Sequence, residues 1–290
     1  MRNGRTIQAR ELGRQLRDLR RTAALSADQV AEDLSLSVPT IYRYESGTTV
    51  PRHTDVKALC EVFGADDDLI DALVALAKES NVAPWWRSYD GAIPRWFDTF
   101  VSLESHASHI RAYDDARVFG LLQTQHYAEA MIRALLPPEI DQEGVSKRVD
   151  LRIRRQRILD RRTPPRLDVI LGEATLARSP GQDIMAEQLS HLDKMSRRSN
   201  VTVRILPLGL VHHGLQCGSS FIMLDFPTDR RGMGEPPMVY ADNLTGAAYL
   251  NEASEVTAYN SVWESLIRDA LSPAASRKII NGYRERYQQS

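Results

Sequence analysis

The side chains with the clearest capacity to contact another molecule lie in one short stretch, VPTIYR. Tyr42 and Arg43 carry a phenol and a guanidinium, which can hydrogen-bond to the edges of bases in a major groove, and Thr40 adds a hydroxyl. Val38 and Pro39 offer only apolar contacts, such as those with a thymine methyl group. These five residues are therefore our candidates for contacting DNA bases.

A first short helix is expected just before this stretch. Residues 27–34 place Val30, Ala31 and Leu34 at the spacing of one buried helical face. Ser26 precedes them in the position of an N-cap. Small Ala31 allows a second helix to approach closely.

The second helix is expected to present the base-contacting candidates. Residues 35–37 break the first helix, with Ser37 placed to cap the next one, and Pro39 lies in a first turn where its missing N–H costs little. Ile41 and Tyr44 then point inward, so the candidates remain on the outer face. Nearby polar residues are candidates for contacting DNA phosphates: Arg17, Arg21, Ser26, Thr49 and Arg52.

Residues 9–64 resemble the DNA-binding domain of the Xre, lambda-repressor-like family. An earlier helix with Leu12, Leu16 and Leu19, a loop with Gly47 and Pro51 and a fourth helix around residues 56–63 complete the family order. The resemblance implies base contacts from Val38, Pro39, Tyr42 and Arg43 to a double-stranded, palindromic operator. The alternative is an unrelated helical hairpin.

Two departures from the Xre pattern affect the details. Ala27 stands where the family usually has a phosphate-binding Gln, and Ser35 stands where it has a turn Gly. Because Val38 and Pro39 make no bidentate contacts, readout must depend on Tyr42, Arg43, methyl contacts or DNA shape.

Positive charge supports DNA binding only locally. The 290-residue chain carries 37 basic and 38 acidic residues, but residues 1–21 hold seven arginines against Glu11 and Asp18. A second basic stretch at residues 147–166 is expected to contact flanking DNA or an acidic partner, or to be an ordinary solvated face.

Length and pattern predict two domains, a DNA-binding domain at 1–80 and a regulatory domain at 81–290. An acidic first turn introduces a fifth helix at about 66–80, and residues 81–84 are expected to link the domains. No apolar run suits a signal peptide or membrane span, so a cytoplasmic protein without a membrane partner is expected. Cys60 and Cys217 fall in different domains, so no disulfide is expected, and no cofactor is implied.

The fold class predicted is a mainly α domain followed by a mixed α/β (α+β) domain. The second domain is expected to be helical over 85–162, including an amphipathic helix at 100–113, and mixed over 163–290. Runs rich in Val, Ile and Phe predict strands at 166–171, 201–207, 219–226 and 238–240. A helix at 184–196 between the first two makes a parallel pair with a crossover plausible. Final helices are expected at about 256–271 and up to residue 287.

A series of motifs runs through this second domain. They are Tyr113, VFGLLQTQHYAEAMIRA at 118–134, the RxxRQ run at 152–156, LDVILGEATLAR at 167–178, QLSHL at 188–192 and VTVRILPLG at 201–209. In this order they resemble WhiJ-like, antitoxin-like Xre regulators of actinomycetes. The resemblance implies a transcriptional regulator whose second domain receives a signal or binds a small BldB-like protein. Phe119 departs from the Pro common before GLLQT.

Enzymatic activity in the second domain is the alternative. His106 and His109, three apart on an expected helix, lack a convincing third metal ligand, and His213 lies in a loop after a strand without a phosphate-binding lysine. A hydrolytic enzyme fused to a DNA-binding module is therefore kept only as the alternative. Trp85, Trp86, Trp96 and His213 are our ligand or partner candidates. A homodimer is expected, because one helix-turn-helix reads only half a site.

Overall fold

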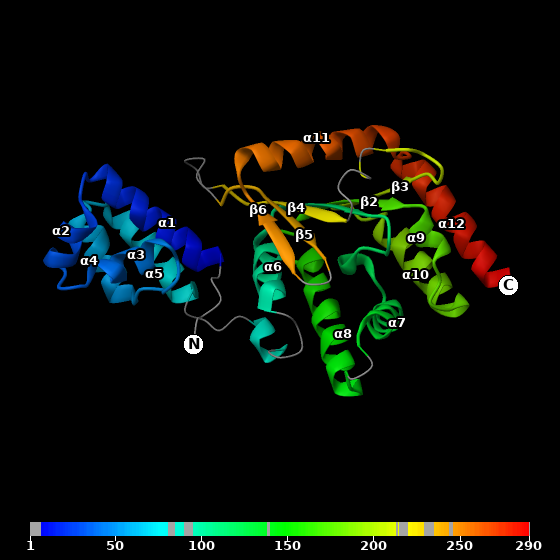
Figure 1. The fold of residues 1–290 in the computed structure, drawn as a ribbon, viewed down its shortest axis with the longest axis horizontal. Helices are drawn as coiled ribbons and strands as arrows, with labels where there is room; N and C mark the ends of the chain where they lie inside the picture. Colours follow the sequence, from blue (N-terminus) through cyan, green and yellow to red (C-terminus); the bar gives the residue numbers. More distant parts are fainter. Residues whose placement is uncertain are drawn as a thin grey trace. The chain divides into compact units, whose positions relative to one another are not determined.

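The computed structural model describes residues 7–80, 85–89, 95–137, 140–212, 214, 220–228, 235–243 and 246–289. The chain divides into two compact units, Met1–Ser88 and Tyr89–Ser290, which are described separately. Figure 1 shows a helical first unit and a second unit built on a sheet. The expected linker at 81–84 lies outside the described residues.

Within residues 7–80 the first unit is a bundle of helices. They are α1 (Ile7–Thr22), α2 (Ala27–Asp33), α3 (Val38–Glu45), α4 (His53–Val62) and α5 (Asp67–Ser80), followed by the short 3-10 helix η1 (Trp85–Tyr89). Their apolar faces meet in one core that contains Leu12, Leu16, Val30, Ile41 and Leu59. The predicted helical order is confirmed.

The turn between α2 and α3 follows from local backbone chemistry. Ser26 accepts a hydrogen bond from the backbone N–H of Gln29, whose side chain bonds back to Ser26, so α2 begins with a capping box. Ser35 adopts the left-handed conformation (φ 54°) that ends α2, and Leu36 N–H closes the turn on Ala31 O. Ser37 occupies the N-cap of α3, but its hydroxyl contacts the Thr40 hydroxyl instead of a backbone N–H.

The second unit contains a mixed sheet in the order β3-β2-β1-β4-β5-β6. Its strands are β1 (His109–Asp114), β2 (Arg166–Gly172), β3 (Val201–Leu206), β4 (Phe221–Asp225), β5 (Met238–Asp242) and β6 (Ala247–Leu250). β1, β2 and β3 pair in parallel, whereas β4, β5 and β6 continue the sheet in antiparallel fashion. β2 connects to β3 through α10 (Gln182–Met195), as the crossover prediction required.

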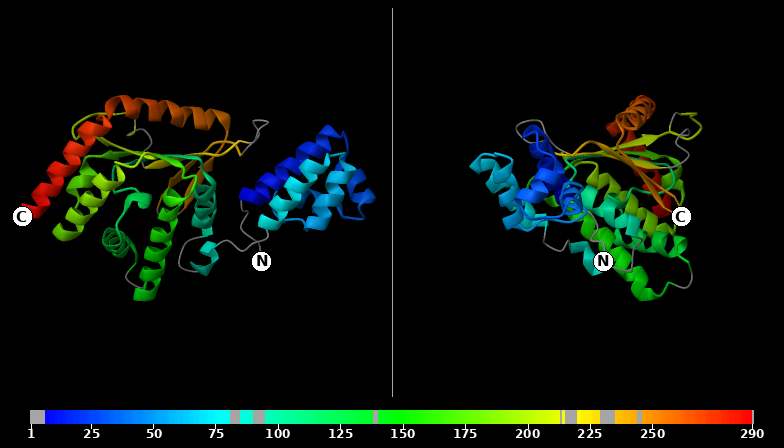
Figure 2. Two further views of the ribbon diagram at one scale, coloured as in Figure 1. Left: turned by 180° about the vertical axis from the view of Figure 1, so that it is seen from behind. Right: turned by 60° about the vertical axis from the view of Figure 1, so that its left-hand side comes forward.

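Helices cover both faces of this sheet. α11 (Ala253–Asp269) lies along one face, where its Trp263 and Leu266 pack on Tyr113 and Phe221. α6 (Arg95–His106), α8 (Gln142–Gln156) and α10 lie on the other side, as the views in Figures 1 and 2 agree. The remaining helices are the 3-10 segments η2 (Gly120–Leu122) and η3 (Arg157–Asp160), with α7 (Gln125–Leu135), α9 (Ala174–Ala177) and α12 (Pro273–Gln289).

The main difference from the sequence prediction is the central strand. The helix expected at 100–113 ends at His106, and His109–Asp114 forms β1. A strand therefore lies inside the region expected to be helical, 85–162, and β6 was not predicted. The four predicted strands and the mixed α/β fold class are confirmed.

Candidate functional site

The outer surface of α3 carries most of the base-contacting candidates. Tyr42 is 55% exposed, and Pro39 and Arg43 are also exposed. The Arg43 guanidinium donates to the Thr40 hydroxyl at 2.8 Å, which in turn contacts Ser37. Val38 is half-buried and packs against the core, so it offers only part of its side chain to a ligand.

A buried ion pair fixes α3 to α1. Arg20 donates two hydrogen bonds to the carboxylate of Glu45, at 2.5 and 2.9 Å, and a third to Leu25 O at 2.9 Å. Glu45 is 5% exposed. The hydrogen bond with Glu45 raises the pKa of Arg20 despite the opposing effect of burial. Because a bidentate pair restrains orientation as well as distance, it holds the last turn of α3.

Four of the five phosphate-contacting candidates are exposed, and the fifth contacts another part of the first unit. Arg21, Ser26, Thr49 and Arg52 are exposed. Arg17 is half-buried, and it donates to the backbone oxygen of Glu45 at 3.1 Å. Arg17 therefore also helps to fix the end of α3. The arginines at positions 2 and 5 lie outside the described residues.

The second unit contains a polar cavity of about 80 Å³ at one edge of the sheet. β1 and β5 end at this edge and β4 begins there, because Tyr113 pairs with Phe221 and Ile222 with Tyr240. Asp114 and Asp242, the last residues of β1 and β5, line the cavity. α6 and α8 supply the opposite walls. Its lining residues are Phe97, Phe100, Tyr113, Asp114, Arg117, Phe119, Gly120, Gln123, Arg152, Arg155, Ser220, Phe221, Ile222, Tyr240 and Asp242.

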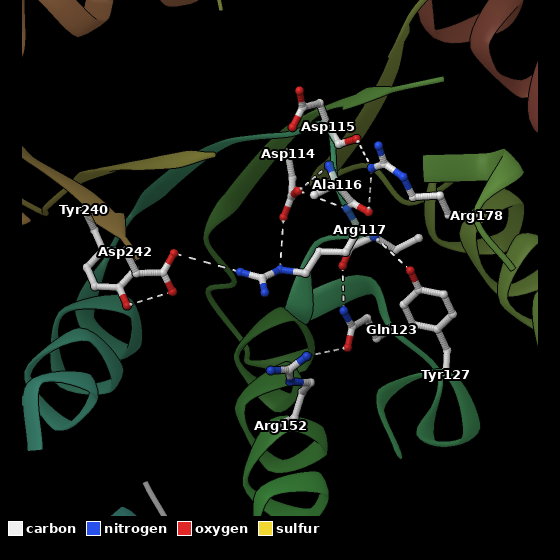
Figure 3. A network of polar contacts seen from close by, with 11 residues as sticks. Asp114, Asp115, Ala116, Arg117, Gln123, Tyr127, Arg152, Arg178, Tyr240 and Asp242 are labelled. Atoms are coloured by element: carbon white, nitrogen blue, oxygen red, sulfur yellow. Dashed lines mark hydrogen bonds and ion pairs between the residues drawn. The ribbon is translucent and has the colours of Figure 1, made fainter. Parts of the chain in front are cut away.

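The side chain of Arg117 lies between the end of β1 and the end of β5 (Figure 3). Its guanidinium lies 3.5 Å from Asp114 and 3.9 Å from Asp242, so both ion pairs are long. Asp114 also accepts hydrogen bonds from the backbone N–H groups of Ala116 and Arg117. Burial nevertheless raises the pKa of Asp114, against the lowering effect of these contacts.

The two arginines of α8 differ in their partners. Arg155 forms a buried bidentate pair with Glu104 of α6, at 2.6 and 2.7 Å, and lies over the rings of Phe97 and Phe100. Arg152, one turn earlier, donates to the side-chain oxygen of Gln123 at 2.7 Å. Burial lowers the pKa of Arg152, and the positive charge of Arg155 acts in the same direction.

None of the predicted ligand or partner candidates is among the described residues that line this cavity. Trp86 is buried, with 7% of its surface exposed. The side chains of Trp85 and Trp96, and the whole of His213, lie outside the described residues. The sequence signal for the cavity is instead the pair of motifs GLLQT and RxxRQ. Residues of both motifs line the cavity, namely Gly120, Gln123, Arg152 and Arg155. Gln156 of the second motif donates to the backbone oxygens of Gly120 and Gln123, so one motif holds the other.

His106 and His109, which the sequence placed on one helix without a third metal ligand, lie in different elements. His106 ends α6 and contacts Ser102 O, whereas His109 begins β1 between Asp168 and Asp225. Across the described residues no group of three or more His, Cys, Asp or Glu side chains is arranged to hold a metal ion.

Most cations of the basic stretch at 147–166 have partners within the second unit, although several of them are exposed. Several of its cations contact partners within the second unit: Lys147 with Glu143, Arg148 with Gly144 O, Arg152 with Gln123, Arg155 with Glu104, Arg161 with Ser105 O, and Arg166 with Asp168. These contacts favour a structural role for most of the stretch.

Each of the two units matches the model of a known protein family. A helix-turn-helix domain model matches residues 11–73, and a family described as a domain of unknown function, DUF5753, matches residues 97–282. The chain belongs to the DUF5753 family. No curated protein and no solved structure matches the chain. The DUF5753 domain thus contains the whole polar cavity, and the helix-turn-helix domain indicates a DNA-binding regulator. No described helix is long and apolar enough to cross a bilayer.

Proposed function

We propose that this protein is a sequence-specific transcriptional regulator of the Xre type, with WhiJ-like, antitoxin-like character. The observation that carries the proposal is the outer face of α3, where Tyr42 and Arg43 are exposed while Arg20 and Glu45 fix the helix from behind. Exposed hydrogen-bonding side chains on a rigidly held helix are what direct readout of a major groove requires.

We propose further that the protein acts as a homodimer on a palindromic operator in the cytoplasm. A single helix-turn-helix buries about 600 to 1,000 Å² against DNA, which is little for a specific complex. Two copies on half-sites one helical turn apart double this area and the number of bases read. The local arginine excess of residues 1–21 suits the phosphates on either side.

In this proposal the DUF5753 domain is regulatory and has no catalytic activity. It senses a small ligand or binds a small BldB-like protein, as the WhiJ-like resemblance implies. The polar cavity supports a receptor role, because pockets of this kind combine apolar walls with a few fixed polar groups.

The proposal is tested by selecting duplexes from a random DNA pool with the full chain and then titrating the selected duplex with variants. Arg43→Ala is expected to weaken binding by about 1 to 3 kcal/mol and to relax preference at one base pair, if Arg43 reads a guanine. Titrations at two salt concentrations separate this role from phosphate binding. If Arg43 holds a phosphate, the affinity of Arg43→Ala should depend less steeply on salt than that of the unchanged protein.

Lys57→Ala is the matched control, because it removes one exposed cation of α4 whose pairing with Glu61 spans 3.9 Å. Its binding should equal that of the unchanged protein. Failure to enrich any sequence would contradict the proposed function. Equal binding by Arg43→Ala and Lys57→Ala would remove Arg43 from the interface.

A further inference from the structure

The guanidinium groups that line the cavity of the DUF5753 domain differ in their partners. Of these three guanidinium groups, that of Arg155 is neutralised by Glu104 at 2.6 Å, and that of Arg117 lies between Asp114 and Asp242. The guanidinium of Arg152 has a different environment. Its partner is the neutral side-chain amide of Gln123, and it forms no ion pair within the part of the chain described above.

This environment is poor for a fixed positive charge. Arg152 is partly withdrawn from water, and the charges of Arg155 and Arg117 repel it more than the charge of Glu104 attracts it. A buried charge without a counter-ion is costly, so proteins normally pair it. A guanidinium also has five N–H donors in a planar fork, of which the bond to Gln123 uses one. The guanidinium of Arg152 therefore offers the cavity a positive charge and N–H donors that the bond to Gln123 does not use.

The rest of the lining limits what else a ligand contains. Phe100 stacks on Tyr240 with ring centroids 4.2 Å apart, which gives an apolar wall next to the charged groups. A volume of about 80 Å³ admits an acid group and only a few further atoms, while the remainder of a ligand extends toward solvent. Lining residues come from α6, α8, β1, β4 and β5, so an occupant contacts both the helices and the sheet.

We propose that this cavity binds a small molecule through a carboxylate or phosphate group that accepts hydrogen bonds from Arg152. The planar fork of the guanidinium matches both oxyanions. Binding also neutralises the charge of Arg152. The proposed ligand class makes the proposed regulatory function more specific. Any effect of the ligand on DNA binding rests on that proposed function, whereas binding of the ligand to the cavity does not.

The binding test uses the full chain without DNA. Thermal unfolding is followed with increasing inorganic phosphate or benzoate, with benzyl alcohol as the uncharged control and sodium chloride to match ionic strength. A saturable rise in the midpoint is expected with at least one of the two anions and with neither control. Phosphate alone assigns phosphate-bearing ligands, and benzoate alone assigns carboxylates.

Variants of α8 identify the group responsible. Arg152→Gln should weaken anion binding at least tenfold, and Arg152→Lys, which keeps the charge but loses the fork, should weaken it less. Lys147→Gln removes an exposed cation from the same helix and should bind as the unchanged protein does. If Arg152→Gln does not fold, the comparison of Arg152→Lys with Lys147→Gln decides. Absence of a saturable response to both anions, or equal affinity in the Arg152 variants and Lys147→Gln, overturns the proposal.

A separate arm tests the consequence for DNA. The selected duplex is titrated with and without the bound anion, and an affinity change of about 5-fold to 150-fold is expected from typical coupling between sites. Anion binding that leaves DNA affinity unchanged supports the cavity as a ligand site and contradicts its regulatory role.

Discussion

His109 is a histidine held between two carboxylates at the start of β1. Its Nε2 lies 2.7 Å from Asp168 and its Nδ1 lies 3.4 Å from Asp225, while Arg166 and Arg111 contact the same two carboxylates. The hydrogen bonds to Asp168 and Asp225 raise the pKa of His109 above its ordinary value, and burial opposes them. Burial alone would raise the pKa of both carboxyls, but the hydrogen bonds and positive charges around them lower it.

These shifts predict how stability depends on pH. Because the pKa of His109 is raised on folding, its contribution to stability is complete below its unfolded pKa of about 6.5 and is lost as pH rises through the folded value. The two aspartates contribute above their unfolded pKa and lose this as pH falls through the lowered folded values. His109→Gln should therefore remove the part of the stability that declines above about pH 6.5, as measured by urea unfolding from pH 5 to 9.

His126→Gln is the control for this measurement. His126 contacts Glu187 at 2.8 Å, but the two side chains are 69% and 47% exposed. Exposed pairs contribute little to stability, so the pH profile should not change. The same profile for His109→Gln and the unchanged protein would show that the cluster does not couple to folding.

Individual site residues were predictable where local sequence determines them. Exposure of Tyr42 and Arg43 follows from the period of α3, because Ile41 must face the core. The cavity residues were not found as a site, since Asp114, Gln123 and Arg152 come together only through strand order and helix packing. The spacing of Arg152 and Arg155 in the sequence does not indicate that the first contacts Gln123 and the second contacts Glu104.

At the level of elements, four helix ends in the first unit use the same left-handed turn. Gly47 and Gly64 occupy this position after α3 and α4, with φ of 64° and 72°. Ala24 and Ser35 occupy it after α1 and α2, with φ of 56° and 54°. A side chain with a Cβ is strained there, whereas glycine is not.

Replacing these two residues by glycine should therefore stabilise the first unit. We expect Ala24→Gly and Ser35→Gly each to add about 0.5 to 1 kcal/mol, because relief of strain exceeds the entropy that glycine adds to the unfolded chain. Amide hydrogen exchange of α1 to α5 in the full chain measures this free energy. Ala72→Gly, in the exposed interior of α5, is the control and should cost about 1 kcal/mol. Destabilisation by all three changes would contradict the strain at Ala24 and Ser35.

The sequence predicted helices better than it predicted the centre of the sheet. The four strands predicted after residue 163 are short runs of β-branched and aromatic residues between turn signals, so their local pattern suffices. β1 instead follows α6 after only two residues, and Phe100, Val101, Leu103 and Ile110 read as one amphipathic stretch. Pairing with β2 and β4, from far along the chain, decides that His109–Asp114 is a strand.

At the level of the whole molecule, the two units have their own cores and should fold separately. Residues 1–88 and residues 89–290, expressed alone, are each expected to unfold cooperatively on heating, as followed by circular dichroism. The first fragment should select the same DNA sequence as the full chain but bind it more weakly, if the second unit supplies the contacts between copies in the proposed homodimer. A fragment without a cooperative transition would show that its core depends on the other unit.

The position of β1 has a consequence for the order in which the two units form during synthesis. β1 ends at residue 114, but its partners β2 and β4 are complete only at residues 172 and 225. At about 5 to 20 residues per second, roughly 6 to 22 s pass before the last of these strands follows β1 out of the ribosome. The helices of the first unit end at Ser80, so all of them are synthesised before β1 begins. A nascent chain therefore carries a completed helix-turn-helix while the domain proposed to control it still lacks half of its sheet.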